Sequence, residues 1–179
     1  AGTTGGSNVA IGNQTMSGVV TGDYNIALGS DAADALTSGL DNIALGRNAL
    51  GKLTVATDNI AIGRHAMSNA TTGAAACHNI AIGVESINGI VTGNYNIALG
   101  KEASAAMTSG SCNIAIGACA GNAVTTQSCT INIGFNMDQT TATVTCIGGS
   151  CLMSTQFTAT SDCRSKKNIK DLPYGLNFI

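Results

Sequence analysis

The sequence has very few large side chains. Among 179 residues it contains no Trp, three Tyr, three Phe and a single Pro, so an interior built on bulky aromatic groups is not expected. Charged residues make up only 10%, whereas about a quarter is usual in a soluble domain. Intrinsic disorder is associated with the reverse composition, in which charge is high and hydrophobicity is low. We therefore expect an ordered chain that is packed through small side chains.

The charge content is as uneven as it is low. The formal net charge is −2, which favours neither nucleic acid nor an anionic membrane as a partner. The eight cationic residues fall into two groups, Arg47, Lys52, Arg64 and Lys101 before residue 160, and Arg164, Lys166, Lys167 and Lys170 after it. No apolar run approaches the roughly 20 residues needed to cross a bilayer, so we predict no membrane insertion. The shift in composition predicts a boundary near residue 160.

What the sequence does contain is a repeat. The pentapeptide NIALG or NIAIG recurs throughout, with NVAIG as its first copy and the degenerate TINIG as its last. The copies start at Asn8, Asn25, Asn42, Asn59, Asn79, Asn96, Asn113 and Thr130. The intervals are 17, 17, 17, 20, 17, 17 and 17 residues. Spacing this regular identifies a tandem-repeat protein.

Each repeat has the pattern of a short strand followed by turns. In NIALG the large residues Ile97 and Leu99 alternate with Asn96, Ala98 and Gly100, a period of two that is typical of a strand. Glycine-containing segments such as TSG and VTG then supply turns. We predict an all-β fold, a repetitive β-solenoid or trimeric β-fibre shaft of 17-residue repeats. The array spans residues 1–136, a connecting β segment spans 137–160, and a separate C-terminal unit begins at 161.

Each repeat contains few large apolar side chains, and this predicts an oligomer. A buried CH₂ group contributes about 0.8 kcal/mol, while ordering the backbone costs about 1–2 kcal/mol per residue. With few sizeable apolar side chains in each repeat, a single coil recovers little of that cost. We expect an obligate homotrimer in which either the Ala/Gly column or the bulky face packs against other chains, and the Ala/Gly column is the surface we favour. A single-chain solenoid is the alternative.

The Asn that opens each repeat is a candidate structural residue. The set is Asn8, Asn25, Asn42, Asn59, Asn79, Asn96 and Asn113. Three interpretations are open: an amide ladder stacked along the fibre axis, a cap on the preceding turn, or a turn residue that tolerates a left-handed backbone. None of them requires a ligand.

All seven cysteines lie at or after Cys77. Cys112 and Cys129 occupy the same phase in consecutive repeats, and neighbouring strands lie about 4.8 Å apart, which is within the Cα range for a disulfide. They either bridge along the stack, bridge between chains, or act as small apolar residues. No CxxC pair is present and the adjacent Cys77 and His78 are not spaced for chelation, so no metal or other cofactor is predicted.

The last stretch, SDCRSKKNIKDLPYGLNFI, differs in kind from the array. It resembles the start of the intramolecular chaperone domain of phage tail spikes, tail fibres and endosialidases. The array itself resembles the NTALG-type repeats of phage and giant-virus fibre proteins. The resemblance implies a homotrimeric fibre whose C-terminal domain assists assembly and is released at Ser161–Asp162, with Lys166 acting with the serine. Ser165 replaces the leucine usual in that family, and we expect the chain to be a fragment of a longer protein.

These observations predict an extracellular structural protein. The array contains no catalytic constellation, so we do not predict an enzyme beyond the single self-cleavage. The leading hypothesis is the homotrimeric shaft of a viral tail fibre or surface appendage, which presents an attachment tip to a host-surface glycan or receptor. The alternative is a bacterial adhesin or extracellular filament whose repeats bind glycan or matrix through variable positions, namely Asp31, Arg47, Arg64, Glu85 and Lys101. An ice-binding solenoid is disfavoured because no regular T-x-T column is present.

Overall fold

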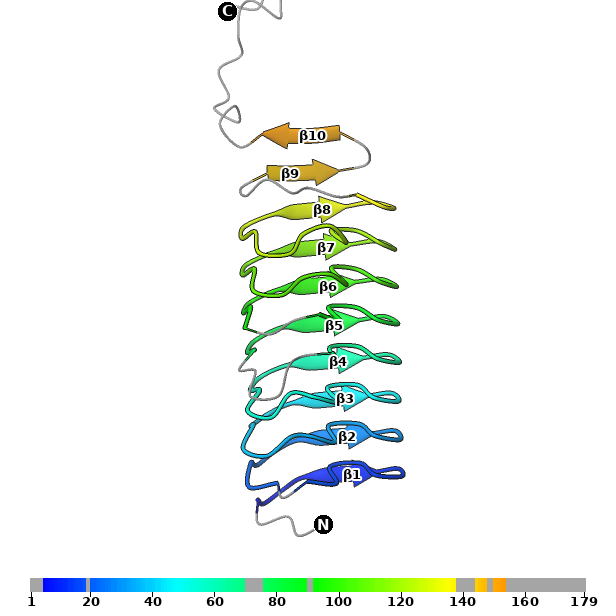
Figure 1. Cartoon of the computed structure of the whole chain (residues 1–179), viewed down its shortest axis with the longest axis vertical. Coiled ribbons are helices and arrows are strands. Elements are labelled where there is room, and N and C mark those ends of the chain that lie inside the picture. Colours follow the sequence, from blue (N-terminus) through cyan, green and yellow to red (C-terminus); the bar gives the residue numbers. More distant parts are fainter. Residues whose placement is uncertain are drawn as a thin grey trace, which may run out of the picture.

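The chain folds into a β-solenoid. The computed structural model describes residues 5–18, 20–69, 76–89 and 92–137, together with the backbone of 144–147 and 150–153. Ten strands form one sheet, in which they follow one another in chain order (Figure 1). The first eight are three-residue strands: β1 (Val9–Ile11), β2 (Ile26–Leu28), β3 (Ile43–Leu45), β4 (Ile60–Ile62), β5 (Ile80–Ile82), β6 (Ile97–Leu99), β7 (Ile114–Ile116) and β8 (Ile131–Ile133). The predicted all-β solenoid is thereby confirmed.

Successive coils, which we call rungs, stack in parallel and in identical phase. Val9 pairs with Ile26, and the same correspondence holds at each step up to β8. The 20-residue repeat does not shift this register, because Ile60 still pairs with Ile80. With about 4.8 Å between strands, the seven steps from β1 to β8 span about 34 Å.

Two further strands follow the eight rungs. β9 (Val144–Ile147) is parallel to β8, and β10 (Ser150–Met153) is antiparallel to β9. Both lie in the stretch predicted as a connecting β segment. In the part of the chain that the structure describes, no helix is long and apolar enough to span a membrane.

The corners of each rung depend on left-handed residues. Three positions recur in each repeat with φ near +50° to +60°, as in Asp31, Ala33 and Asp41, and they are non-glycine residues except at Gly121. This conformation costs about 1–2 kcal/mol per residue, but it turns the peptide planes parallel to the stack axis. The N–H of Asp31 donates to Asn13 O of the rung before (2.9 Å), and that of Ala33 donates to Ala49 O of the rung after (2.9 Å). A buried peptide group left without a partner costs a similar amount, so the corners keep this strained form.

The interior is narrow and is filled from one chain. The central Ala of the strands is buried in Ala27, Ala44, Ala61, Ala81, Ala98 and Ala115, each at most 1% exposed. Larger buried side chains fill the remaining space, including Leu36, Leu50, Leu53, Met67, Ile87 and Met107. The expectation that the Ala column is an interchain surface is therefore wrong. The space beneath each strand accepts a small side chain, the methyl group of Ala in β2 to β7 and the amide of Asn132 in β8, so the smaller residue points inward.

The glycine that ends each strand cannot be replaced without distortion. Gly63 has φ +132°, and a Cβ built on it would lie 2.5 Å from Gly83 O in the next rung. We predict that Gly63→Ala lowers the free energy of unfolding by about 2–4 kcal/mol, since both backbone strain and a clash with fixed backbone oppose it. Thermal or denaturant unfolding measures this loss.

Gly18→Ala is the matched control. Its nearest non-local atom, Asp34 O, is 3.4 Å from the added Cβ, so its effect should lie within about 1 kcal/mol of zero. Equal losses in the two variants would contradict the assigned role of the glycine column.

Candidate functional site: an outward aliphatic face and its two edges

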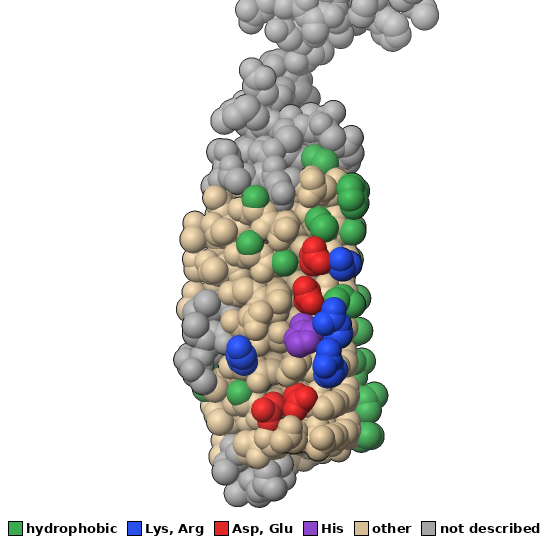
Figure 2. Space-filling model, turned by 45° about the vertical axis from the view of Figure 1, so that its right-hand side comes forward, with side chains coloured by type: hydrophobic (Ala, Val, Ile, Leu, Met, Phe, Trp, Pro, Cys, Tyr) green, Lys and Arg blue, Asp and Glu red, His purple; other side chains and the backbone are tan. Residues whose placement is uncertain are grey.

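The outer surface of the parallel strands is an aliphatic face. Each of β1 to β8 directs its first and third side chains outward, and these sixteen residues are Val9, Ile11, Ile26, Leu28, Ile43, Leu45, Ile60, Ile62, Ile80, Ile82, Ile97, Leu99, Ile114, Ile116, Ile131 and Ile133. Figure 2 shows hydrophobic side chains in a column that follows the stack. Ile11 is 59% exposed, Leu28 46% and Ile82 40%. Contiguous apolar patches of more than a few hundred Å² mark interaction sites.

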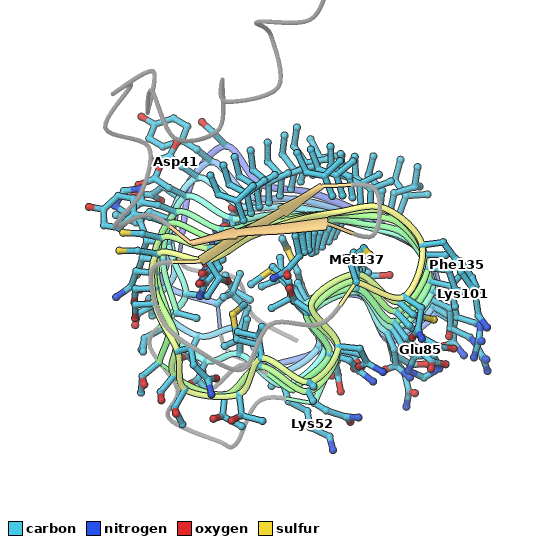
Figure 3. All side chains as sticks on the ribbon, turned by 90° about the horizontal axis from the view of Figure 1, so that it is seen from above. Asp41, Lys52, Glu85, Lys101, Phe135 and Met137 are labelled. Carbon is cyan, nitrogen blue, oxygen red and sulfur yellow. The ribbon has the colours of Figure 1, made fainter. Side chains whose placement is uncertain are left out.

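The position of this face is unusual for a parallel sheet. Parallel strands are normally covered on both sides, but here the inner side faces the coil and nothing in the described chain lies over the outer side. Figure 3 shows the row of side chains that projects from the stacked strands away from the interior. The face is therefore the part of the molecule best suited to contact another surface.

One margin of the face, the pre-strand edge, consists of the residue before each repeat-opening position. Its members are Ser7, Tyr24, Asp41, Asp58, His78, Tyr95, Cys112 and Cys129, all with φ between 54° and 60°. Stacking brings neighbours into contact: the rings of His78 and Tyr95 lie parallel with centroids 4.8 Å apart, and His78 Nδ1 lies 3.5 Å from Asp58 Oδ2. Sequence reasoning did not identify this column, although its fixed place before each Asn was a sufficient signal.

The other margin, the post-strand edge, consists of the two residues after each strand-ending glycine. In rungs two to six it contains Ser30, Asp31, Arg47, Asn48, Arg64, His65, Val84, Glu85, Lys101 and Glu102. Arg64 pairs with Glu85 at 3.2 Å. All five variable residues of the predicted contact stripe lie on this edge. In Figure 3, Lys101 and Glu85 lie on the side of the molecule opposite Asp41.

A second ion pair lies within one rung of the post-strand edge. Lys101 Nζ lies 2.8 Å from Glu102 Oε1. The hydrogen bond and the charge of Glu102 raise the pKa of Lys101, and the same contact lowers the pKa of Glu102. Both side chains therefore remain charged at neutral pH, and this part of the edge is ionic.

The repeat-opening asparagines stack behind the pre-strand edge as a ladder of amides. Asn59 Nδ2 donates to Asn42 Oδ1 (3.1 Å) and to Ala76 O (2.8 Å), and Asn59 Oδ1 accepts from the backbone N–H of Asn79 (3.0 Å). The pattern repeats from Asn8 to Asn113, and Thr130 continues it through its hydroxyl group. None of the seven asparagines has positive φ; the left-handed residue is the one before each of them. The ladder therefore explains the Asn column without a ligand.

This ladder can be tested with a change of one atom. Asn59→Asp removes the side-chain N–H donors and places a carboxylate against Asn42 Oδ1 and Ala76 O, at a position that is 0% exposed. We predict a loss of about 3 kcal/mol or more in the free energy of unfolding at neutral pH, with partial recovery in acid as the carboxylate becomes protonated.

Asn69→Asp makes the same chemical change at an exposed site of the same rung and should change stability by less than about 0.5 kcal/mol. A loss of similar size in both variants, measured by denaturant unfolding, would show that the amide ladder is not a major source of stability.

Cys112 and Cys129 lie on consecutive rungs of the pre-strand edge. Both are exposed free thiols in the structure. The N–H of Cys112 donates to Asn94 O and that of Cys129 to Ser111 O, each at 3.0 Å, so the two share one backbone geometry. Their pairing remains a prediction.

We expect diamide, which accepts the two hydrogens that the thiols release, to join Cys112 to Cys129 because rung spacing of about 4.8 Å suits a disulfide. Unreduced peptide mapping identifies the bond, with Cys112→Ser as the control. A non-reducing gel separates a bridge within one chain from a bridge between chains. Continued maleimide labelling of both thiols after oxidation would contradict the prediction.

The residues proposed for self-cleavage, Ser161, Asp162 and Lys166, lie outside the described residues. Comparison of the chain with protein-family models, with curated proteins and with solved structures yields no match. What the structure shows is a tandem-repeat β-solenoid with one outward aliphatic face between a pre-strand and a post-strand edge.

Proposed function

We propose that this chain is a structural fibre protein, a shaft segment in which three copies pack their aliphatic faces around a common axis. The shaft belongs to a viral tail fibre or a surface appendage outside the cell, and it holds an attachment tip at a distance from the base. The observation that carries this proposal is the aliphatic face, which runs without interruption over eight rungs.

The face supplies enough free energy for association. Covering an exposed aliphatic side chain contributes about 1.5–3 kcal/mol. The face has sixteen such residues that are already partly covered by their neighbours, so it can contribute on the order of 10 kcal/mol per chain. Loss of translational and rotational freedom costs roughly 4–15 kcal/mol. A face limited to one or two rungs would not offset that cost, whereas one that extends along the whole stack can.

The number of copies rests on shape and on resemblance. Each face is two side chains wide, so three faces can enclose a closed triangular core with no edge left exposed to water. The C-terminal stretch resembles a domain of trimeric fibres, which supports the same number. The stacked rungs also suit a shaft because each one bonds only to its neighbours, and added repeats lengthen the rod without new contacts.

A second candidate is an adhesin that binds glycan or matrix along the post-strand edge. It is favoured by the clustering of Asp31, Arg47, Arg64, Glu85 and Lys101 on one margin. However, the charge there changes from rung to rung, and Arg64 already pairs with Glu85. Such a stripe presents no repeated binding site, so the shaft is the better explanation.

The proposal predicts the molar mass of the intact particle. Light scattering should give three times 17.8 kDa, or a multiple of that value, with and without reductant. Ile82→Lys places a charge on the face at a position that is 40% exposed and should shift the particle toward monomers, because a charge buried among apolar groups is costly.

Val55→Lys is the matched control, since Val55 is 37% exposed and lies outside the strands; it should leave the mass unchanged. A wild-type chain that remains monomeric at all accessible concentrations would overturn the proposed shaft and favour a self-sufficient solenoid.

A further inference from the structure

Opposite charges lie on the two sides of the aliphatic face in two successive rungs. In the third rung, Asp41 precedes β3 and Arg47 follows it. In the fourth, Asp58 precedes β4 and Arg64 follows it. All four side chains are exposed. Figure 3 shows Asp41 at one margin of the face and Lys101, which shares the post-strand edge with the two arginines, at the other.

The direction in which a second copy packs decides which edges meet. Rotation about an axis parallel to the stack brings the pre-strand edge of one copy against the post-strand edge of the next, rung by rung. A copy that runs in the opposite direction instead brings two pre-strand edges together and two post-strand edges together. Opposite charges across an interface attract and like charges repel, so the two aspartates and the two arginines oppose the antiparallel arrangement.

We propose that the copies pack parallel and in register, with Asp41 and Asp58 of one copy facing Arg47 and Arg64 of the next. This rests on the proposed shaft and specifies how its chains meet. A closed ring permits no rung offset, because a constant offset at each interface would build an open helix instead. Each aspartate therefore lies level with the arginine of the same rung number in the adjacent copy.

The neighbouring rungs are compatible with this pairing. In the fifth rung His78 would face Val84 and Glu85, and in the sixth Tyr95 would face Lys101, a cation beside an aromatic ring. No rung from the second to the sixth then opposes two charges of the same sign across the edges.

Contacts within each chain make the third rung the stronger contributor to the electrostatic preference for parallel packing. Arg64 pairs with Glu85 at 3.2 Å and Asp58 contacts His78 at 3.5 Å, so each already has a partner. Asp41 and Arg47 form no ion pair with the described part of their own chain. The pairing of Asp41 with Arg47 should therefore account for most of the electrostatic preference.

Three charge variants of the full chain test the register. The first carries Asp41→Arg with Asp58→Arg, the second carries Arg47→Asp with Arg64→Asp, and the third carries all four changes. The first and second leave both edges with one sign, so each should weaken self-association at least about tenfold at low ionic strength, and the deficit should shrink in high salt. The third restores opposite charges and should recover wild-type association to within about threefold.

Two further variants keep the test interpretable. Asp41 and Asp58 have left-handed φ, which asparagine tolerates better than arginine, so Asp41→Asn with Asp58→Asn removes the charges with little strain and should weaken association by a smaller factor. Lys52→Asp changes the charge at a position that Figure 3 shows on the side away from the face, and it should have no effect. Circular dichroism and thermal unfolding report whether each variant retains its fold.

Mixing the first two variants separates the register from the number of chains. In a ring of three, at least two adjacent chains are of one kind, so one interface stays repulsive and a 1:1 mixture recovers only part of the association. In a ring of two, every interface is attractive and recovery is complete. Complete recovery would overturn the trimer but support the parallel register.

The remaining outcomes also decide between the proposals. A wild-type monomer, measured by light scattering, would overturn both the shaft and the register. A wild-type oligomer whose mass is insensitive to all charge variants would overturn the register while the shaft stands. The register would also be overturned, and the shaft would stand, if the fourfold variant folds but fails to reassociate.

Discussion

Hydrogen bonding along the stack axis is the constraint on which the whole structure depends. Peptide groups in the strands and at the corners bond to the rung before or the rung after, and the Asn side chains add a buried amide column in the same direction. A bond of this kind forms only if the neighbouring rung has the same backbone path. One path must therefore be repeated at an interval of 17 residues, and the three extra residues of the fourth rung leave the register unchanged.

The demand for axial bonding also explains the backbone strain. The left-handed non-glycine residues that recur in the rungs, including the buried Ile87 with φ 46°, would each be unfavourable in isolation. They persist because a corner in the ordinary right-handed conformation would direct its N–H and C=O groups away from the adjacent rungs. The strain is local, and the bonds that hold it are distributed over the whole stack.

A narrow interior determines the outer surface in turn. Since the coil accepts only a small residue beneath each strand, Ala in β2 to β7 and Asn132 in β8, the large members of the alternating pattern point outward. The aliphatic face thus follows from the size of the coil, and so does its position between the two edges. The proposed shaft and its parallel register make use of a surface that the fold leaves uncovered.

The sequence by itself determined the architecture of this protein. The interval from Asn42 to Asn59, repeated along the chain, and the alternation in Ile97, Ala98 and Leu99 were sufficient to predict an all-β solenoid or β-fibre, because a repeated path and a period of two have few other solutions. The choice of interior face could not be predicted, since alternation is symmetrical with respect to inside and outside. Only the closed coil, whose interior is filled by residues such as Leu50, places Ala98 inside and leaves Ile97 and Leu99 outside. The two edges likewise required the tertiary structure, because Asp41 and Arg47 lie on opposite sides of the face only once the strand between them is extended and stacked.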